Sequence, residues 1–485
     1  MKKLGLYLLV AIFCFSCTKL NYEEYTVLDV NAFPKNEEDL NALMIASVYA
    51  PFKGIFYGDE RSITSVGDVT TDLGDVNWVW PITKQDFVGG PSGDYVWSFY
   101  RYVGKMNTMT LTLDRINKVD LAEEVKTRMI AETKCGRAFM GYLMYDWFGP
   151  VPIVPLEIME KPLEDIVVPR PTNMEMVAFI ENNLKEAIPG LPARYNLGDA
   201  NFGRFTRGLA YTLLMKLYMH EKRWGEAVEV GRELQKPEYG LGLMDNYKDI
   251  FTINNQGNKE IIWCNNRNSS SGQAWLAFVL SSQYPTNNKN IQKWSMYKVP
   301  WSFYNTFDPA DKRLEVLVGE FLGLDGVLYN QANPGGYELG LGALPVKYGE
   351  DPNDLGTSSE IDLVVYRYAD VITLLAEAIV REGNVITGEA LALLNEVHTR
   401  AGLTAYQLSD FGGPEEFLSA ILLERGHELW FEGARRTDLI RHGKYIEVGI
   451  VKGSVLTRPG FEVMPLPQTA IDEGRGEIIQ NEAYR

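Results

Sequence analysis

Residues 361–443 show the most regular pattern of apolar positions in the chain. Apolar side chains recur there every three or four residues, which is the spacing of one face of an amphipathic helix. The inward-facing positions are Val371, Leu374, Leu375, Ala378 and Ile379, followed by Ala390, Leu391, Leu394 and Val397. Gly383-Asn384 and Gly402 follow these two runs, so we predict that the first two helices end there.

A third helix is predicted to begin at Pro414. Proline fits the first turn of a helix, because that position needs no backbone N–H donor. Glu415 and Glu416 complement the positive end of the helix dipole, and Gly433 is the expected terminator. The stretch therefore predicts three consecutive helices and an all-helical scaffold.

Helical patterns also recur in the N-terminal half. Residues 36–54 predict a capped amphipathic helix, and residues 95–117 and 122–149 predict two long helices with methionine, leucine and aromatic side chains on one face. Stripes of this kind are buried core far more often than cofactor sites. We therefore expect these helices to build the core.

Two helical hairpins repeat one another. In residues 206–240 the packing positions have tetratricopeptide spacing, and they are Tyr211, Leu214, Tyr218, Ala227, Gly231 and Leu234. The same spacing, with a slightly longer loop, recurs at Leu375, Ala376, Ile379, Ala390, Leu394 and Val397. Tetratricopeptide units stack or bind proteins, so this repeat predicts a scaffold and defines no function by itself.

The third predicted helix mixes charged and apolar residues. Glu424 and Glu428 share one face at i and i+4, which would suit a paired-carboxylate site, and His427-Glu428 could open a zinc motif. The zinc motif fails, because Phe431 stands where its second histidine is needed. We favour a structural interpretation, since buried charges persist only when they are paired. The expected partners of the carboxylates are Arg425, Arg435, Arg436 and Arg441.

This stretch resembles a known family. The run ERGHELWFEGARRTDLIRHGKY (424–445) resembles the C-terminal signature of the SusD/RagB family, with Gly426-His427 where the family commonly has a further basic residue. The runs YRYADVITLLAEAIVREGN (366–384) and LLNEVHTRAGL (393–403) resemble the helical pair that precedes this signature.

The resemblance implies a fold, a location and a function. The implied fold is mainly α, with a tetratricopeptide-like helical-repeat scaffold, long irregular loop insertions and a few short strands. Family members are outer-membrane lipoproteins that capture nutrients, mostly glycans, for a SusC-like TonB-dependent transporter. The resemblance thus implies a non-catalytic lipoprotein whose partners are a glycan, the transporter and, through its lipid, the membrane.

The N-terminal sequence has the features of an exported protein. Residues 1–16 predict a signal peptide, because their apolar run is shorter than the ~20 residues that a helix needs to span a bilayer. Ser16-Cys17 resembles a lipobox, so we predict acylation of Cys17, with Cys14 in place of the usual leucine. Ordinary secretory cleavage nearby is the alternative. Residues 17–36 would form the lipidated N-terminus and a polar tether.

Composition sets the outer limits. The 485 residues are 46% hydrophobic, so the chain can bury a large core as one large domain or two interleaved halves. The formal net charge of −17 argues against nucleic acid and anionic lipid as partners. Beyond the lipobox the chain contains Cys135 and Cys264, too few for a disulfide framework, and the sequence leaves their pairing open.

We divide the mature chain into two regions. The N-terminal region spans residues 37–250 and contains a Gly-, Asp- and Trp-rich ligand loop at 62–99. The C-terminal region spans residues 251–485 and contains a loop insertion at 254–360 ahead of the helical signature 361–443. Long stretches without a helical period are usually functional or poorly ordered.

The tryptophan content of the two loops indicates whether they are functional or poorly ordered. Disordered polar segments are poor in tryptophan, yet both loops contain several. A pyranose has an apolar face and a hydroxyl-bearing edge, so a sugar site needs a flat aromatic ring beside amide or carboxylate groups. The candidate glycan-binding residues are Trp78, Trp80, Asn77, Trp275, Tyr284, Trp294 and Asn288. Trp97 and Trp263 are expected in the core, and Trp301 belongs to residues 299–313, which resemble a structural element of the family.

No catalytic motif is present. The sequence lacks the patterns of serine hydrolases, P-loops and dinucleotide-binding folds, and its four histidines are scattered. Asp351, Asn353, Gly356 and Asp362 fit calcium-loop positions, but Leu355 occupies a ligand position and Asp replaces the terminal Glu. We therefore expect a turn and no cofactor, with bound calcium as the alternative. The alternatives to glycan binding are a glycoside hydrolase, a tetratricopeptide adaptor without a small ligand, and a family member specialised for peptides.

Overall fold

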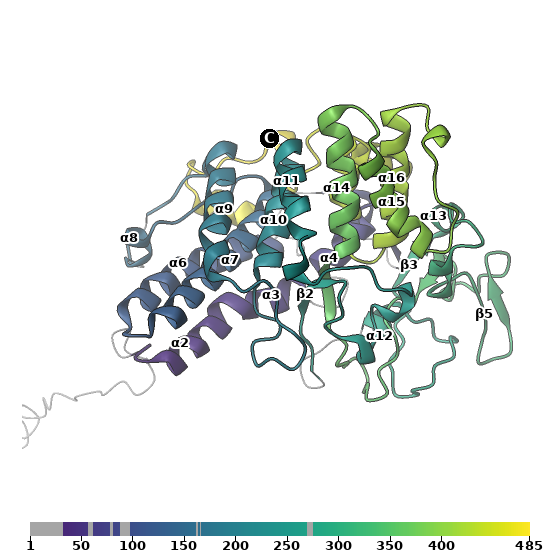
Figure 1. Cartoon of the computed structure of the whole chain (residues 1–485), viewed down its shortest axis with the longest axis horizontal. Helices are drawn as coiled ribbons and strands as arrows, with labels where there is room; N and C mark the ends of the chain where they lie inside the picture. Colours follow the sequence, from purple (N-terminus) through teal and green to yellow (C-terminus); the bar gives the residue numbers. More distant parts are fainter. Residues whose placement is uncertain are drawn as a thin grey trace, which may run out of the picture.

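The structure is a computed structural model that describes residues 33–56, 62–77, 81–87, 98–161, 163–164, 166–268 and 275–485. These residues form a mainly α-helical molecule, as the sequence predicts. Figure 1 shows the helices following one another along the long axis, with β2 (Ile261–Asn265) near the middle of the molecule and β3 (Tyr297–Pro300) and β5 (Glu320–Leu322) toward one end. The predicted signal peptide, Cys17 and most of the predicted tether lie outside the described residues.

The long helices agree with the predicted ones. The N-terminal helices are α2 (Glu37–Met44), α3 (Ala50–Ile55), α4 (Ile63–Val69), α6 (Tyr102–Lys118), α7 (Glu123–Phe148), α8 (Leu156–Met159) and α9 (Asn173–Ala187). The central helices are α10 (Arg207–His220), α11 (Trp224–Leu234), α12 (Trp275–Val279) and α13 (Trp301–Tyr304). The C-terminal helices are α14 (Tyr368–Gly383), α15 (Gly388–Arg400), α16 (Pro414–Leu429), α17 (Arg435–Arg441), α18 (Tyr445–Val451) and α19 (Gln468–Glu473). The short helices α4, α12 and α13 lie in the two stretches that were predicted to have no helical period.

Short strands form three small antiparallel sheets. The strands are β1 (Asp75–Val76), β2 (Ile261–Asn265), β3 (Tyr297–Pro300), β4 (Leu317–Val318), β5 (Glu320–Leu322), β6 (Leu328–Asn330), β7 (Gly342–Pro345) and β8 (Leu363–Arg367). The sheet orders are β1-β3-β7-β4, β2-β8 and β5-β6. Strand β8 lies inside the stretch predicted to be all helical, because its buried residues pair with β2 before α14 begins.

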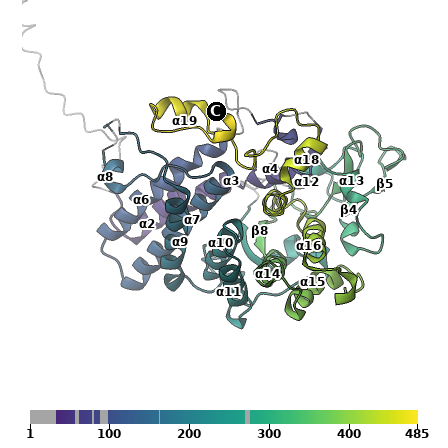
Figure 2. The ribbon, with the colours of Figure 1, turned by 90° about the horizontal axis from the view of Figure 1, so that it is seen from above.

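Successive helical hairpins stack side by side to form the scaffold. Helix α6 packs on α7, α7 on α9, α10 on α11, and α11 on α14, which in turn packs on α15 and α16. Seen from above, α10, α11, α14 and α15 lie next to one another (Figure 2). A Cβ atom at Gly231 of α11 would lie 2.9 Å from Leu375 and 3.0 Å from Met215. Glycine therefore permits the close crossing that joins the two predicted repeats.

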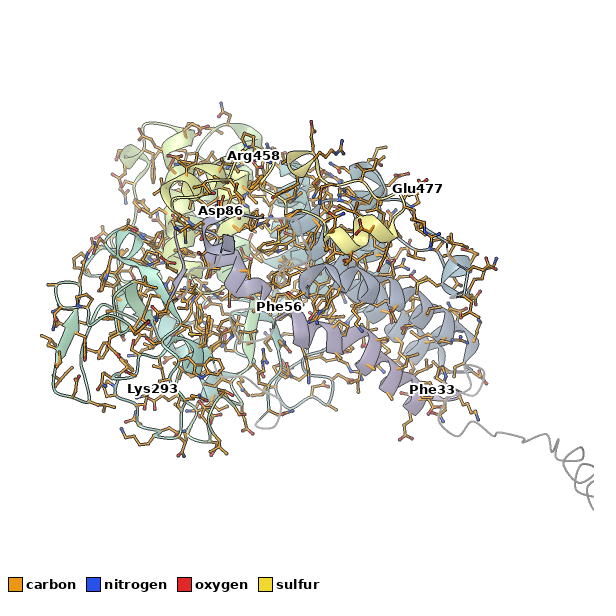
Figure 3. All side chains as sticks on the ribbon, turned by 180° about the vertical axis from the view of Figure 1, so that it is seen from behind. Phe33, Phe56, Asp86, Lys293, Arg458 and Glu477 are labelled. Atoms are coloured by element: carbon orange, nitrogen blue, oxygen red, sulfur yellow. The ribbon has the colours of Figure 1, made fainter. Side chains whose placement is uncertain are left out.

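The two predicted regions interleave around one core. Phe56 at the end of α3 packs against Phe139 of α7 at 5.8 Å and against Trp263 of β2 at 6.0 Å between ring centroids. Figure 3 shows the α2–α3 segment crossing the back of the molecule between Phe33 and Phe56. Trp263 is 5% exposed, which confirms its expected place in the core.

Helix α16 ends earlier than predicted. Its last residue is Leu429, so the prediction that Gly433 terminates this helix was wrong, and α17 is a separate helix. Phe431 adopts a left-handed backbone with φ of 61° and turns its ring toward Trp275 at 4.5 Å. Gly433 (φ 77°) instead allows close approach of another helix, since a Cβ atom there would lie 2.7 Å from the Thr64 Cα of α4.

The charges of α16 form buried ion pairs, as the structural interpretation predicts, but with other partners. Arg313 lies 2.7 Å from Glu424 and 3.2 Å from Glu428, and Glu428 also pairs with Arg367 and Arg400. The predicted partners were wrong, because those arginines are engaged elsewhere. The observed pairs are Arg425 with Asp370 and Asp438, Arg435 with Asp72, Arg436 with Asp146, and Arg441 with Glu377 and Asp438.

Candidate functional site

The pairing of β1 with β3 joins the two loop regions that the sequence predicts to bind a ligand. Asp75 lies opposite Lys298 in this ladder, and the backbone N–H of Asn77 donates to the carbonyl of Met296 at 3.0 Å. The side-chain amide of Asn77 also donates to the carbonyl of Ser295. Two predicted residues, Asn77 and Trp294, are therefore brought close together although 217 positions separate them.

The C-terminal helices fix the segment that leads to Asn77. The Lys452 ammonium, at the end of α18, donates to the carbonyls of Val69 (2.9 Å), Thr71 (2.8 Å) and Gly74 (2.7 Å). Arg435 of α17 makes two hydrogen bonds of 2.8 Å to the carboxylate of Asp72. Two separate helices therefore hold the base of the first loop in place.

The segment around Trp294 is held equally firmly. The backbone N–H of Trp294 donates to the carbonyl of Ala277 at 2.8 Å, and the backbone N–H of Ser295 donates to the carbonyl of Leu280 at 2.9 Å. Ser295 has a left-handed backbone with φ of 54°. The Trp294 ring is partly buried, so it retains some exposed surface.

Tyr337 is the one exposed aromatic side chain within the described residues, with 71% of its surface accessible. Its carbonyl accepts a hydrogen bond of 2.5 Å from the Ser295 hydroxyl, which places it beside the Trp294 segment. The next residue, Glu338, accepts hydrogen bonds from the Ser282 hydroxyl (2.5 Å) and the Gln283 backbone (3.1 Å). Sequence reasoning missed Tyr337, although the preceding Gly335-Gly336 pair indicates a turn that would expose the ring.

A buried lysine lies beneath this surface. The Lys298 ammonium donates to the carbonyl of Val279 at 3.3 Å and to the hydroxyl of Ser295 at 3.2 Å. Burial lowers the pKa of Lys298 to about 7, against the opposing effect of the Glu338 carboxylate. Ser295 therefore connects the buried lysine, the Tyr337 loop and the Asn77 side chain.

The other predicted residues occupy varied positions. Tyr284 is partly buried and its ring meets Phe321 edge-on at 5.2 Å. Asn288 uses its amide nitrogen to bind the carbonyls of Asp351 (3.1 Å) and Asp354 (2.9 Å), so it joins two loop segments. Both residues lie in the second loop region, but the amide of Asn288 is already occupied within the protein.

Trp275 lies in the core rather than on the surface. It is 4% exposed, and its ring packs at 4.5 Å from Phe431 and 6.0 Å from Phe278. This placement argues against the predicted ligand contact, because no ring face is open to a sugar. The predicted residues Trp78 and Trp80 lie outside the described residues.

A groove of about 560 Å³ lies beside β1. Its walls include Asp72, Asp75, Pro300 and the aliphatic side chains of Leu423 and Val451. The described residues that line it include no aromatic ring, so this groove lacks a stacking surface for a pyranose.

The cysteines and the calcium-like residues have local structural roles. Cys135 and Cys264 are both buried as free thiols. Asp362 accepts a hydrogen bond of 2.8 Å from the Arg267 backbone, whereas Asp351 binds backbone groups of its own turn. Leu355 is 71% exposed. Asp351 and Asp362, two of the residues that fit calcium-loop positions, therefore bind separate backbone groups, and the expected lack of a cofactor stays a prediction.

Comparison with known proteins places the chain among glycan-binding relatives. Residues 329–449 match the model of the SusD family, and residues 20–219 match a model described as "Starch-binding associating with outer membrane". A SusD-like protein of Bacteroides ovatus is 25% identical over 414 residues, which cover 80% of this chain and 73% of that protein. The starch-binding protein SusD of Bacteroides thetaiotaomicron is 22% identical over 454 residues, covering 80% and 78% of the two chains.

Solved structures share the same fold. Surface glycan-binding protein A from Bacteroides thetaiotaomicron, in complex with laminarihexaose, superposes with a TM-score of 0.73 at 21% identity and covers 92% of this chain and 99% of its own. A SusD homolog from the same organism reaches a TM-score of 0.78 at 20% identity, covering 94% and 99% of the two chains. Within the part of the chain that the structure describes, every helix is too short or too polar to cross a membrane.

Proposed function

The chain belongs to the SusD/RagB family, and on that basis we propose that it binds an oligo- or polysaccharide at the cell surface and passes it, unaltered, to a SusC-like TonB-dependent transporter. The two family models match residues 20–219 and 329–449, one in each half of the chain. One relative is a starch-binding protein, and one solved neighbour holds laminarihexaose. The observation that supports the proposal is the β1–β3 pairing, beside which Asn77 and the Tyr337 backbone both contact Ser295, the sequence neighbour of Trp294.

This surface offers what a sugar ring requires. The exposed ring of Tyr337 provides an apolar face for the C–H side of a pyranose, and the partly buried Trp294 adjoins Ser295, whose hydroxyl binds the Tyr337 backbone. The Asn77 amide is fixed through its nitrogen, so its oxygen points from a defined position and can accept a sugar hydroxyl. A pre-formed platform of this kind reduces the entropy lost on binding.

Isothermal titration against starch, laminarin, xylan and mannan tests the binding, and chromatography of the recovered glycan tests whether its bonds stay intact. We expect saturable binding to at least one polysaccharide with no new reducing ends. Release of shorter sugars would instead favour the glycoside hydrolase alternative, in which two carboxyl groups flank the scissile bond.

The proposal also includes a lipid anchor at Cys17. Acylation would attach more than one fatty chain, which is enough for stable anchoring where a single chain is marginal. The match of residues 20–219 to an outer-membrane-associating family supports this location. In cells, Cys17→Ala should move the protein from the outer-membrane fraction to a soluble fraction, and protease treatment of intact cells should degrade only the wild type.

A further inference from the structure

A small pocket lies where helices α15 and α16 meet the loop that follows α13. Its volume is about 380 Å³, at the lower end of the ~300–1,000 Å³ that small-molecule sites occupy. Its rim contains the exposed side chains of Thr306 and Asp308, and its floor contains the buried side chains of His398, Glu424 and His427. None of these residues is among the predicted glycan-binding residues, and the pocket is therefore a separate feature.

A hydrogen bond fixes the tautomer of His398. Its Nδ1 lies 2.8 Å from a carboxylate oxygen of Glu424. Although burial would raise it, the Arg313 charge and the His398 hydrogen bond lower the pKa of Glu424 to about 2, so this carboxylate is ionised and only accepts hydrogen bonds. Nδ1 of His398 therefore carries the hydrogen, and Nε2 of the neutral ring remains as an acceptor.

His427 has the opposite tautomer. The Thr306 hydroxyl donates its single hydrogen to the carbonyl of Phe303 at 2.7 Å, so it accepts a hydrogen bond from Nε2 of His427 at 2.8 Å. Burial and the Arg313 charge lower the pKa of His427 to about 3, against the Glu424 charge, which keeps the ring neutral. Nδ1 is therefore the acceptor that remains on His427.

The two remaining acceptors, Nε2 of His398 and Nδ1 of His427, have no hydrogen-bond partner among the described residues. Both side chains are more than nine-tenths buried, since His398 is 8% exposed and His427 is 6% exposed. Tyr406 stacks on the His398 ring at 4.1 Å, and Phe307 lies 4.0 Å from the His427 ring between centroids. Two acceptors held in fixed positions within a pocket indicate a ligand that donates hydrogen bonds.

The composition of the pocket narrows the class of ligand. Among the described residues, no three His, Cys, Asp or Glu side chains could hold one metal ion, so the acceptors do not converge on a single point. A ligand that satisfies them needs several separate donors. The described lining residues include the carboxylates of Asp308 and Glu424 but no lysine or arginine, which disfavours an anion. Glu424 is already paired with Arg313 at 2.7 Å, so the floor does not require a cation.

We propose that this pocket binds one uncharged sugar ring through its hydroxyl groups, which donate to His398 Nε2, to His427 Nδ1 and to the Asp308 carboxylate at the rim. A sugar ring carries several hydroxyl donors at fixed separations, and Tyr406 and Leu423 add apolar surface beside its C–H groups. The ring belongs either to a free monosaccharide or to the end of a glycan chain. The small volume excludes a longer stretch of chain.

Histidine NMR tests the pocket directly. The chain contains four histidines, so ¹³C labelling of histidine Cε1 gives one signal for each ring. The full chain is titrated with glucose, galactose, mannose and xylose at millimolar concentrations, and with maltotriose and mannotriose. We expect saturable shifts of the His398 and His427 signals with at least one of these sugars, while the His220 and His442 signals stay in place.

The variant His398→Asn removes the acceptor but keeps the structural hydrogen bond. The asparagine amide nitrogen takes the place of Nδ1 and can donate to Glu424, whereas Nε2 is lost. The Kd for the bound sugar should therefore rise at least about tenfold. The matched control is His220→Asn, because His220 also bonds a carboxylate through Nδ1, that of Glu221 at 2.8 Å, and lies outside the pocket. It should bind like the wild type, and the two variants assign their own signals.

The source of the ring follows from the same titrations. Shifts with the monosaccharides indicate a free-sugar site, shifts with the trisaccharides alone indicate a chain-end site, and either result supports the proposal. Absence of histidine shifts with all six sugars overturns it, and so does an equally strong effect of glucuronate, whose charge the carboxylates should repel. Should His398→Asn fail to fold, the wild-type spectra still decide the matter.

This pocket goes beyond the proposed function, and the two can fail separately. Tyr337→Ala alters the proposed glycan surface and none of the residues that line the pocket, so its histidine shifts should match those of the wild type. Loss of polysaccharide binding with intact histidine shifts would leave the pocket standing. Polysaccharide binding without histidine shifts would support only the Tyr337 surface and would overturn the pocket.

Discussion

Tyr337 is the residue whose exposure bears most directly on ligand binding. Its ring is 71% exposed on a loop held to Ser295, and no other described aromatic is as open. Tyr337→Ala should weaken binding of the best glycan about tenfold, because it removes a stacking face while its loop stays anchored through the backbone. Tyr337→Phe keeps the ring and should bind within about twofold of the wild type. Equal affinity of the alanine variant and the wild type in calorimetry would remove Tyr337 from the site.

Arg313 is the residue on which the buried charges of α16 depend. It is fully buried and pairs with Asp311, Glu424 and Glu428. Arg313→Gln should lower the free energy of unfolding by about 3–5 kcal/mol, because three carboxylates lose their buried partner. Lys248→Gln breaks a pair with Glu315 whose side chains are about half exposed, and it should cost at most about 1 kcal/mol. Urea denaturation compares the two, and similar losses would show that burial of the pair is unimportant.

Asp68 should give the stability an unusual pH dependence. It is fully buried, one carboxyl oxygen accepts the Gly433 N–H at 3.2 Å and the other has no partner among described residues. Burial raises its pKa to about 8, against the Gly433 hydrogen bond and the Lys347 charge, while the Glu432 charge adds to the rise. The folded state holds the Asp68 proton more tightly than the unfolded state does. The protonated Asp68 carboxyl therefore stabilises the fold fully below the unfolded pKa of about 4, and this stabilisation is lost as pH rises toward 8.

The Asp68→Asn variant isolates this effect. It should flatten the decline in unfolding free energy between about pH 5 and pH 8, since asparagine cannot ionise. Urea denaturation at several pH values measures both slopes. Parallel slopes for variant and wild type would mean that Asp68 is charged in the folded protein.

At the scale of elements, the contact between α4 and the 430–434 turn holds the first loop region onto the C-terminal helices. A Cβ atom at Gly433 would meet the Thr64 backbone at 2.7 Å, whereas Gly443 has a similar φ of 67° and open space around it. Gly433→Ala should therefore cost about 2–4 kcal/mol, while Gly443→Ala should cost only the backbone strain of about 1 kcal/mol. Urea denaturation of both variants tests this, and equal costs would show that the α4 contact is easily displaced.

The helices were predictable because their pattern is local. Periodicity located α7, α10, α11, α14 and α15, and the proline-led start of α16. The end of α16 was not predictable, because it depends on Phe431 packing against Trp275, which lies far away in the sequence. The strand β8 was missed for the same reason, since its partner β2 is about 100 residues distant.

The candidate site was predictable only in part. Composition identified the two loop regions, but not their juxtaposition, which rests on the two-residue strand β1 pairing with β3. The same composition could not separate a core tryptophan such as Trp275 from a partly exposed one such as Trp294. Tyr337 was missed because the search for ligand-binding aromatics relied on tryptophan-rich stretches. The ion-pair partners of Glu428 could not be inferred from charge alone.

At the scale of the whole molecule, a stacked helical scaffold supports loops that converge at one end (Figure 1). Buried charge pairs and the β1–β3 ladder hold these loops in fixed positions, so the proposed binding surface exists before a ligand arrives. A rigid surface suits the proposed capture and hand-over of a glycan, because a pre-formed surface loses less entropy on binding.

Hydrogen exchange with mass spectrometry, with and without the best-bound polysaccharide, tests the central claim that the joined loops form the binding surface. Peptides that cover residues 72–77, 290–297 and 334–340 should exchange more slowly when the glycan is bound, while those of α10 and α11 stay unchanged. Protection confined to the helical hairpins, with no change in the three loop segments, would contradict the account.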